Sequence, residues 1–108
     1  MKQQSALKQE AKIIVHVDPD IADLIPAFLE NRQKDIKTIG EALAKDDFET
    51  IRFLGHSMKG AGGSYGFDPI TDIGRALEQA AIAKDDTGIK KSLQELFAYL
   101  DCLEVVYK

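Results

Sequence analysis

Apolar residues recur every three or four positions along most of the chain from residue 25 onward, and this periodicity is the strongest constraint on its fold. Such spacing places the apolar side chains on one face of a helix. Four successive segments show it, and the connections between them are only a few residues long. We therefore expect an all-α, up-down-up-down four-helix bundle over residues 18–108. The apolar positions are Ile25, Leu29, Ile36, Ile39 and Leu43; Ile51, Leu54, Met58 and Ala61; Ile70, Ile73, Leu77, Ala80 and Ala81; and Ile89, Leu93, Leu96, Leu100, Leu103 and Tyr107.

Cap and breaker residues indicate where these helices begin. The pairs Asp18-Pro19 and Asp68-Pro69 each look like an N-cap residue followed by proline at the first helical position. Pro26 predicts a break or kink, because proline removes a donor and clashes with the preceding turn. Asp46 and Glu49 have the spacing of a capping box at the start of the next helix.

Residues 1–17 are expected to be an N-terminal extension outside the bundle. The segment 1–12 is polar, and we expect it to be partly flexible. The segment 13–17 reads IIVHV, which is rich in β-branched residues and favours a short extended strap. A first short helix is the alternative. We do not expect a sheet, because a lone strand would have nothing to pair with.

Charge and composition exclude several classes of function. The chain has 14 Lys and Arg against 18 Asp and Glu, so it lacks the basic stripe typical of nucleic-acid binding. Its single cysteine excludes an internal disulfide, and with two histidines no metal site is expected. The apolar run 13–15 is too short for a signal peptide or a membrane span. We expect a cytoplasmic protein, monomeric by default, that binds neither nucleic acid nor membrane.

The second predicted helix carries an unusual number of glycines. Gly55, Gly60, Gly62 and Gly63 all fall within it, and each costs about 0.8–1 kcal/mol of helix stability relative to alanine. Close packing against a neighbouring helix explains Gly62 and extends to Gly55, because both lie beside the apolar stripe. It does not explain the other two glycines.

One histidine lies on the outer face of the same helix. At 100° per residue, His56 points about 170° away from the centre of the apolar stripe. Lys59 and Arg52 flank it, and Gly60 and Gly63 leave bare backbone beside it. A neutral imidazole is a nucleophile that forms covalent intermediates, and a cation can offset the charge of a transferred phosphoryl group. This pattern predicts a docking face around one reactive histidine.

The segment H-S-M-K-G-A-G-G-S-Y-G resembles the motif of histidine-containing phosphotransfer (HPt) domains. The family pattern has a histidine, then lysine and glycine three and four residues later, and a second glycine ten residues after the histidine. His56, Lys59, Gly60 and Gly66 stand at these positions. The motif lies on the second helix of the predicted bundle, as it does in the family.

The resemblance implies a role for each matching residue. His56 would be the phosphoacceptor, Lys59 would stabilise the phosphoryl group, and Gly60 would leave room for a partner. Gly66 would let the chain turn at the helix end. A polar residue on the next helix hydrogen-bonds the histidine in some members, and Glu78 or Gln79 could serve here.

The outer face offers further candidate contacts for a partner. Gly63 and Arg52 border the histidine, and Phe53 lies about 60° from it around the helix. Phe53 either contacts the partner or folds against a neighbouring helix.

The resemblance further implies a phosphorelay carrier in two-component signalling, not an enzyme with ATPase or autokinase activity. Its partners would be response-regulator receiver domains and a histidine kinase. The carrier needs no cofactor of its own, and the magnesium ion would belong to the receiver.

Other interpretations remain open at this point. A domain linked to a kinase of the chemotaxis type is one, although the stand-alone carrier is preferred because the chain ends at residue 108. A helical interaction module that is never phosphorylated is another, and the intact lysine and glycines argue against it. A metal-binding bundle would need inward-facing ligands, whereas His56 is expected to point outward.

Overall fold

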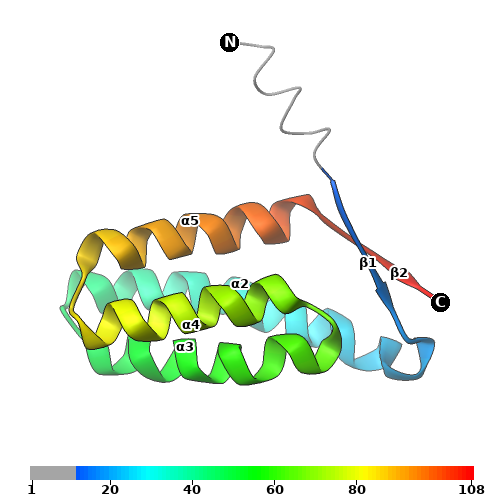
Figure 1. Ribbon diagram of the computed structural model, residues 1–108, viewed down its shortest axis with the longest axis horizontal. Coiled ribbons are helices and arrows are strands. Elements are labelled where there is room, and N and C mark those ends of the chain that lie inside the picture. Colours follow the sequence, from blue (N-terminus) through cyan, green and yellow to red (C-terminus); the bar gives the residue numbers. More distant parts are fainter. Residues whose placement is uncertain (1–11) are drawn as a thin grey trace, which may run out of the picture.

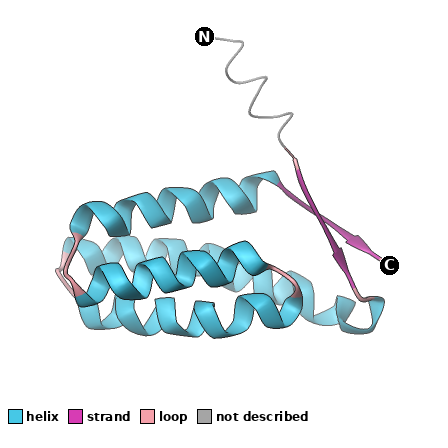
Figure 2. Ribbon diagram, viewed as in Figure 1, coloured by secondary structure: helices cyan, strands magenta, loops and turns pink. Residues whose placement is uncertain are grey.

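A computed structural model describes residues 12–108, and residues 1–11 of the segment 1–12 that was expected to be flexible lie outside the described residues. The described part of the chain is mainly helical, with one pair of strands (Figure 2). In chain order the elements are β1 (Ile13–Val17), the 3-10 helix η1 (Pro19–Leu24), α2 (Ile25–Ala44), α3 (Phe48–Gly62), the 3-10 turn η2 (Gly63–Tyr65), α4 (Asp68–Ile82), α5 (Asp86–Cys102) and β2 (Leu103–Tyr107).

The four α-helices of the described region pack into a bundle (Figure 1). Helix α2 contacts α3 and α5, and α4 contacts the same two helices from the other side. The predicted apolar stripes meet in the middle, where burial of these side chains supplies the main stabilising term. The largest fully buried side chains are Phe67, Ile25, Ile39, Ile51, Met58, Ile70, Leu77, Ile89 and Leu96.

The helices begin close to the cap residues that the sequence predicts, although two of these starts are shifted by one residue. Asp18 accepts a hydrogen bond from the Asp20 backbone N–H at 2.9 Å. Helix α3 is capped by Asp47, which accepts from the Thr50 N–H at 3.2 Å, so the expected capping box at Asp46 is wrong. Asp46 instead has a φ of 57°, a left-handed turn conformation.

Helix α4 also starts one residue away from the expected position. Its N-cap is Phe67, and Asp68 is already helical, with Pro69 behind it in the first turn. Pro26 lies at the start of α2, just after η1, so the predicted break is present. Proline is tolerated there because the first helical N–H groups have no intrahelical acceptor.

The prediction that no sheet forms is wrong. Strand β1 pairs in parallel with β2, from Ile13 opposite Leu103 to Val17 opposite Tyr107. The last helix therefore ends at Cys102, not near Tyr107 as its apolar spacing indicated. In Figure 1 this β1–β2 ribbon lies at the end of the bundle where α2 begins and α5 ends.

Helices α3 and α4 approach each other closely at three glycines. A Cβ atom at Gly74 would lie 2.5 Å from the Lys59 backbone nitrogen, and one at Gly55 would lie 2.7 Å from the Glu78 nitrogen. A Cβ at Gly62 would meet the Thr71 nitrogen at 2.6 Å. Only glycine fits at these points, which explains Gly55 and Gly62 as packing residues, as expected; Gly63, the fourth glycine predicted for this helix, lies in η2.

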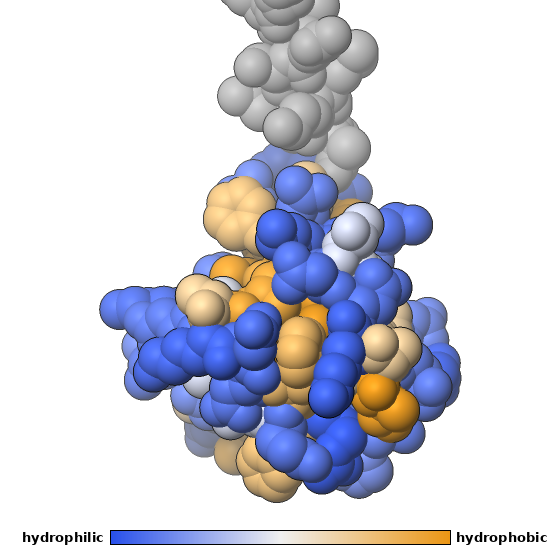
Figure 3. Space-filling model, turned by 90° about the vertical axis from the view of Figure 1, so that its left-hand side faces the viewer, coloured by the Kyte–Doolittle hydropathy of each residue, from blue (hydrophilic) through white to orange (hydrophobic). Residues whose placement is uncertain are grey.

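The surface of the bundle is mostly polar. At the end opposite the ribbon, hydrophilic residues surround a smaller group of hydrophobic ones (Figure 3). Among residues 12–108, none of the helices combines the length and the apolar character that crossing a membrane requires.

Candidate functional site

His56 lies on the outer face of α3. Its side chain is 64% exposed, whereas Ile51 and Met58 on the opposite face are fully buried. The helical phase that buries the apolar stripe therefore turns the imidazole outward, as the sequence predicts. A partner can reach this ring without any movement of the bundle.

A carboxylate from α4 holds the histidine and the neighbouring lysine together. Oε2 of Glu78 lies 3.0 Å from Nδ1 of His56, and Oε1 lies 2.8 Å from Nζ of Lys59. The Glu78 side chain is only 11% exposed, although both of its partners reach the surface. One buried carboxylate thus positions two groups on the adjacent helix.

The electrostatics of this contact fix the state of the carboxylate. The ion pair with Lys59 is the largest influence on the pKa of Glu78 and lowers it. Burial opposes this effect, and the hydrogen bond from His56 adds to it. Glu78 is therefore ionised at neutral pH and can only accept hydrogen bonds.

An ionised acceptor selects one tautomer of the histidine. Nδ1 must carry the proton that it donates to Glu78, which leaves the lone pair on Nε2. Because the ring is held at Nδ1, Nε2 is the nitrogen available to an incoming group. This arrangement can perform nucleophilic chemistry at Nε2 with a cation close by.

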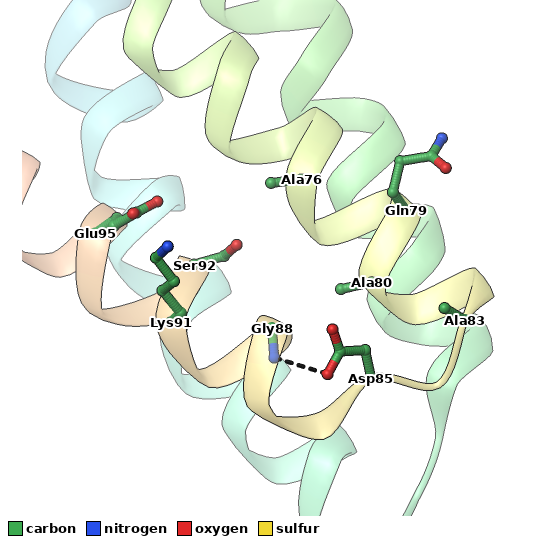
Figure 4. A pocket seen from close by; sticks show the side chains of 9 residues that line it. All are labelled: Ala76, Gln79, Ala80, Ala83, Asp85, Gly88, Lys91, Ser92 and Glu95. Carbon is green, nitrogen blue, oxygen red and sulfur yellow. Dashed lines mark hydrogen bonds between the residues drawn. The ribbon is translucent and has the colours of Figure 1, made fainter.

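Of the two sequence candidates on α4, the structure brings Glu78 to His56 and not Gln79. Gln79 is exposed and borders a groove of about 360 Å³ between α4 and α5 (Figure 4). Ala76 and Ala80 of α4 and Ser92 of α5 line the same groove, so Gln79 belongs to a different face of the helix.

The two side chains preceding His56 on its outer face differ in their surroundings. Arg52 lies 2.8 Å from Glu49, and this hydrogen bond raises the pKa of the guanidinium. Its positive charge is thus shared with Glu49. Phe53 is 63% exposed, so it does not fold against a neighbouring helix. An exposed aromatic residue three positions from His56 provides an apolar contact surface.

The remaining glycines of the motif occupy three different environments. A Cβ at Gly60 would meet nothing within 4 Å, so no internal contact explains this glycine. Gly63 opens η2, and its N–H donates to the Thr71 hydroxyl at 2.7 Å. Gly66 has a φ of 92°, a left-handed conformation that favours glycine, and it ends the turn after α3.

Sequence reasoning missed two residues that support the site. The Thr71 hydroxyl donates to the Lys59 carbonyl at 3.0 Å and so fixes the end of α3 to α4. Gly74 permits the close approach that brings Glu78 within reach of His56. In the sequence, the signal that could have found these two residues was a threonine and a glycine on the side of α4 that faces α3. Within residues 12–108, no cluster of His, Cys, Asp and Glu is arranged to hold a metal ion.

The fold is a four-helix bundle, and its candidate site is one exposed histidine that a buried carboxylate orients. The family model described as Hpt domain matches residues 23–105, and the chain therefore belongs to the Hpt domain family. Comparison with curated proteins and with solved structures gave no match. Hpt domains are phosphotransfer carriers in two-component signalling, and they interact with receiver domains and kinases.

Proposed function

We propose that this protein is a phosphorelay carrier that is phosphorylated on Nε2 of His56. It accepts the phosphoryl group from a receiver aspartate, or from a histidine kinase, and passes it to another receiver. The observation that carries the proposal is the contact of Glu78 with both His56 and Lys59. The proposal includes an up-down-up-down order of helices, favoured by their short connections, and a cytoplasmic location beside its partners.

The chemical step needs little from this chain beyond position and charge. The Nε2 lone pair attacks the phosphorus of the aspartyl phosphate, and the P–O bond breaks as its electron pair returns to the aspartate. The histidine ring keeps the Nδ1 proton and becomes a cation, which the adjacent Glu78 carboxylate offsets. Transfer to the next receiver is the reverse of this step.

Lys59 supplies the positive charge that the new group requires. A phosphoryl group carries a charge of about −1.5 to −2 near neutral pH. Before transfer, Nζ of Lys59 lies 2.8 Å from Oε1 of Glu78. Lys59 is one helical turn from His56, so its Nζ can move from Glu78 to a phosphoryl oxygen. The magnesium ion of the reaction belongs to the receiver. We expect no ATPase or autokinase activity from this chain.

The partner docks on the outer face of α3. Gly60 leaves open space beside the histidine, and Phe53 offers an exposed aromatic ring. Gly63 and Arg52 complete the proposed docking face. Gly60 lowers the stability of α3, and no packing contact within the protein compensates for this loss. This supports a role for Gly60 in admitting the partner's active site.

The test is phosphoryl transfer from a panel of phosphorylated receiver domains. The wild type is expected to take up an acid-labile, base-stable label, and His56→Gln is expected to take up none. His16→Gln removes the other histidine and serves as the matched control that keeps the label. If neither the receivers nor a histidine kinase with ATP labels the wild type, the protein is a non-phosphorylated interaction module and the proposal is wrong.

A further inference from the structure

The β1–β2 ribbon adds a feature to the bundle that the family match does not cover. Strand β1 lies outside the matched residues 23–105. A parallel pair with no third strand is unusual, because such sheets are normally covered and isolated strand pairs are marginally stable. In the described part of the chain, β1 has β2 on one side and no strand on the other.

The backbone hydrogen bonds show which groups of β1 face the open edge. The Val17 carbonyl accepts from the Lys108 N–H at 3.0 Å, so Val17 faces β2. Alternation along a strand places Ile13 and Val15 on the same side. The N–H and C=O groups of Ile14 and His16 therefore point to the open edge, where no described backbone group meets them.

The open edge lacks the features that normally prevent strand addition. Between Lys12 and Asp18, β1 contains only apolar residues and one histidine, with no proline or charged side chain inside the strand. Ile14 is 56% exposed on the outer face. The ribbon lies at one end of the bundle (Figure 1), where Val15 and Val17 pack against the core, and the outer edge of β1 meets no other strand of the described residues.

We propose that β1 pairs antiparallel, through this open edge, with β1 of a second copy of the chain. A two-fold axis through Val15 places Ile14 opposite His16 of the other copy. Both residues direct their N–H and C=O groups to the edge, so each such pair exchanges two hydrogen bonds. The result is one continuous sheet in the order β2, β1, β1, β2, with an isologous interface.

Charge complementarity favours this occupant and this register. The same axis places Lys12 opposite Asp18 of the other copy, at both ends of the pairing, and Lys12 has no ion pair among the described residues. Self-pairing of β2 around Val106 would also join opposite charges, Glu104 to Lys108, but it would use a strand that carries the charged Glu104 within it, a feature that discourages strand addition. The edge of β1 thus combines charge complementarity with a strand that has no charged residue inside it. This inference replaces the monomer expected from the sequence.

Sedimentation of the full chain over a range of concentrations tests the proposal. The mass is expected to rise from 11.9 kDa toward twice that value as concentration increases. Ile14→Pro removes an N–H from the open edge without removing a β1–β2 hydrogen bond, and it is expected to remain monomeric. The matched variant Ile14→Thr keeps the N–H and is expected to dimerise.

A second variant covers the case in which the proline variant fails to fold. Lys12→Glu places like charges opposite each other twice, and it is expected to weaken dimerisation about tenfold. Lys34→Glu makes the same change of net charge on α2 and is expected to leave dimerisation unchanged. Equal weakening by both variants would mean that the interface lies elsewhere.

Cross-linking tests the register directly. Val15 lies on the proposed axis, opposite itself, in a non-hydrogen-bonded pair with Cα atoms about 4.5 Å apart. Val15→Cys in a Cys102→Ser background is therefore expected to form a covalent dimer on mild oxidation, whereas Val106→Cys in that background is not. A wild type that stays monomeric at every concentration, or a dimer that persists in folded Ile14→Pro, would overturn the proposal. Neither result bears on phosphorylation of His56.

Discussion

Glu78 accepts a hydrogen bond from His56 across the α3–α4 interface, with Oε2 3.0 Å from Nδ1. The carboxylate is nearly buried, whereas the imidazole is mostly exposed. A rigid acceptor below the surface thus holds an exposed ring in one orientation and in one tautomer. The same carboxylate retains Lys59 through its other oxygen, so the resting site is balanced in charge before a phosphoryl group arrives.

Glu78→Ala should slow phosphoryl transfer to His56. Without the acceptor the ring can rotate, and the Nε2 lone pair is no longer held in line with the phosphorus. We expect a loss of about tenfold to a hundredfold in the transfer rate. Glu78→Gln, which keeps an acceptor but loses the charge, should lie between the alanine variant and the wild type. Rates measured with a receiver that labels the wild type check this order, and equal rates for all three proteins would contradict the assigned role.

The ionisation of Glu78 should also make the free energy of unfolding depend on pH. The pKa of Glu78 is lowered in the folded protein, mainly by Lys59. The stability that it contributes is complete above the ordinary glutamate pKa of about 4.3 and is lost as pH falls through the lower folded pKa. The stability difference between wild type and Glu78→Gln should therefore shrink as the solution is acidified.

Urea unfolding at a series of pH values from neutral downward measures this difference. Asp72→Asn removes an exposed carboxylate from the same helix, which forms a surface ion pair with Arg75, and it serves as the control. A Glu78→Gln difference that stays constant across the acidic range would show that Lys59 does not stabilise the ionised form.

Helix periodicity predicted most of the fold because each stripe is a local property of the sequence. The strand pair was not predictable in this way, because Ile13 pairs with Leu103 at the far end of the chain. The segment Leu103–Tyr107 also continues the apolar spacing of α5, so its pattern favours a longer helix. Pairing with a distant strand overrides that local preference.

The residues of the candidate site that belong to the sequence motif could be predicted. The residue that depends on how a helix is rotated about its axis could not. His56, Lys59 and Gly60 follow from their spacing on one helix. Glu78 and Gln79 are adjacent in sequence and differ by about 100° around α4. The choice between them depends on how α4 is rotated against α3, and the close contact of Gly74 with the α3 backbone sets that rotation. No local pattern contains this information.

Gly74→Ala should destabilise the protein and disturb the site. Its Cβ would lie 2.5 Å from the Lys59 nitrogen and 2.7 Å from the Gly55 carbonyl oxygen, both backbone atoms that cannot move aside cheaply. We expect a loss of about 1–3 kcal/mol in the free energy of unfolding, as for overpacked cores. Transfer to His56 should slow as well, because separating the helices withdraws Glu78.

Gly40→Ala is the matched control for that variant. A Cβ at Gly40, within α2, would meet nothing within 4 Å. The substitution should stabilise the protein by about 0.5–1 kcal/mol through helix propensity alone. Urea unfolding compares the two variants, and a Gly74→Ala protein as stable as Gly40→Ala would exclude the close α3–α4 contact.

Gly60→Ala should separate stability from function. A Cβ at this position would meet nothing within 4 Å apart from the backbone of its own helix turn, so the alanine variant should gain about 0.5–1 kcal/mol in the free energy of unfolding, as at Gly40. Its added methyl group nevertheless stands on the proposed docking face, one turn from His56. Transfer should slow with Gly60→Ala and fall at least about tenfold with the bulkier Gly60→Leu, whereas Gly40→Ala keeps the wild-type rate. A Gly60→Leu protein that is folded and transfers at the wild-type rate would place the docking surface on another face of the bundle.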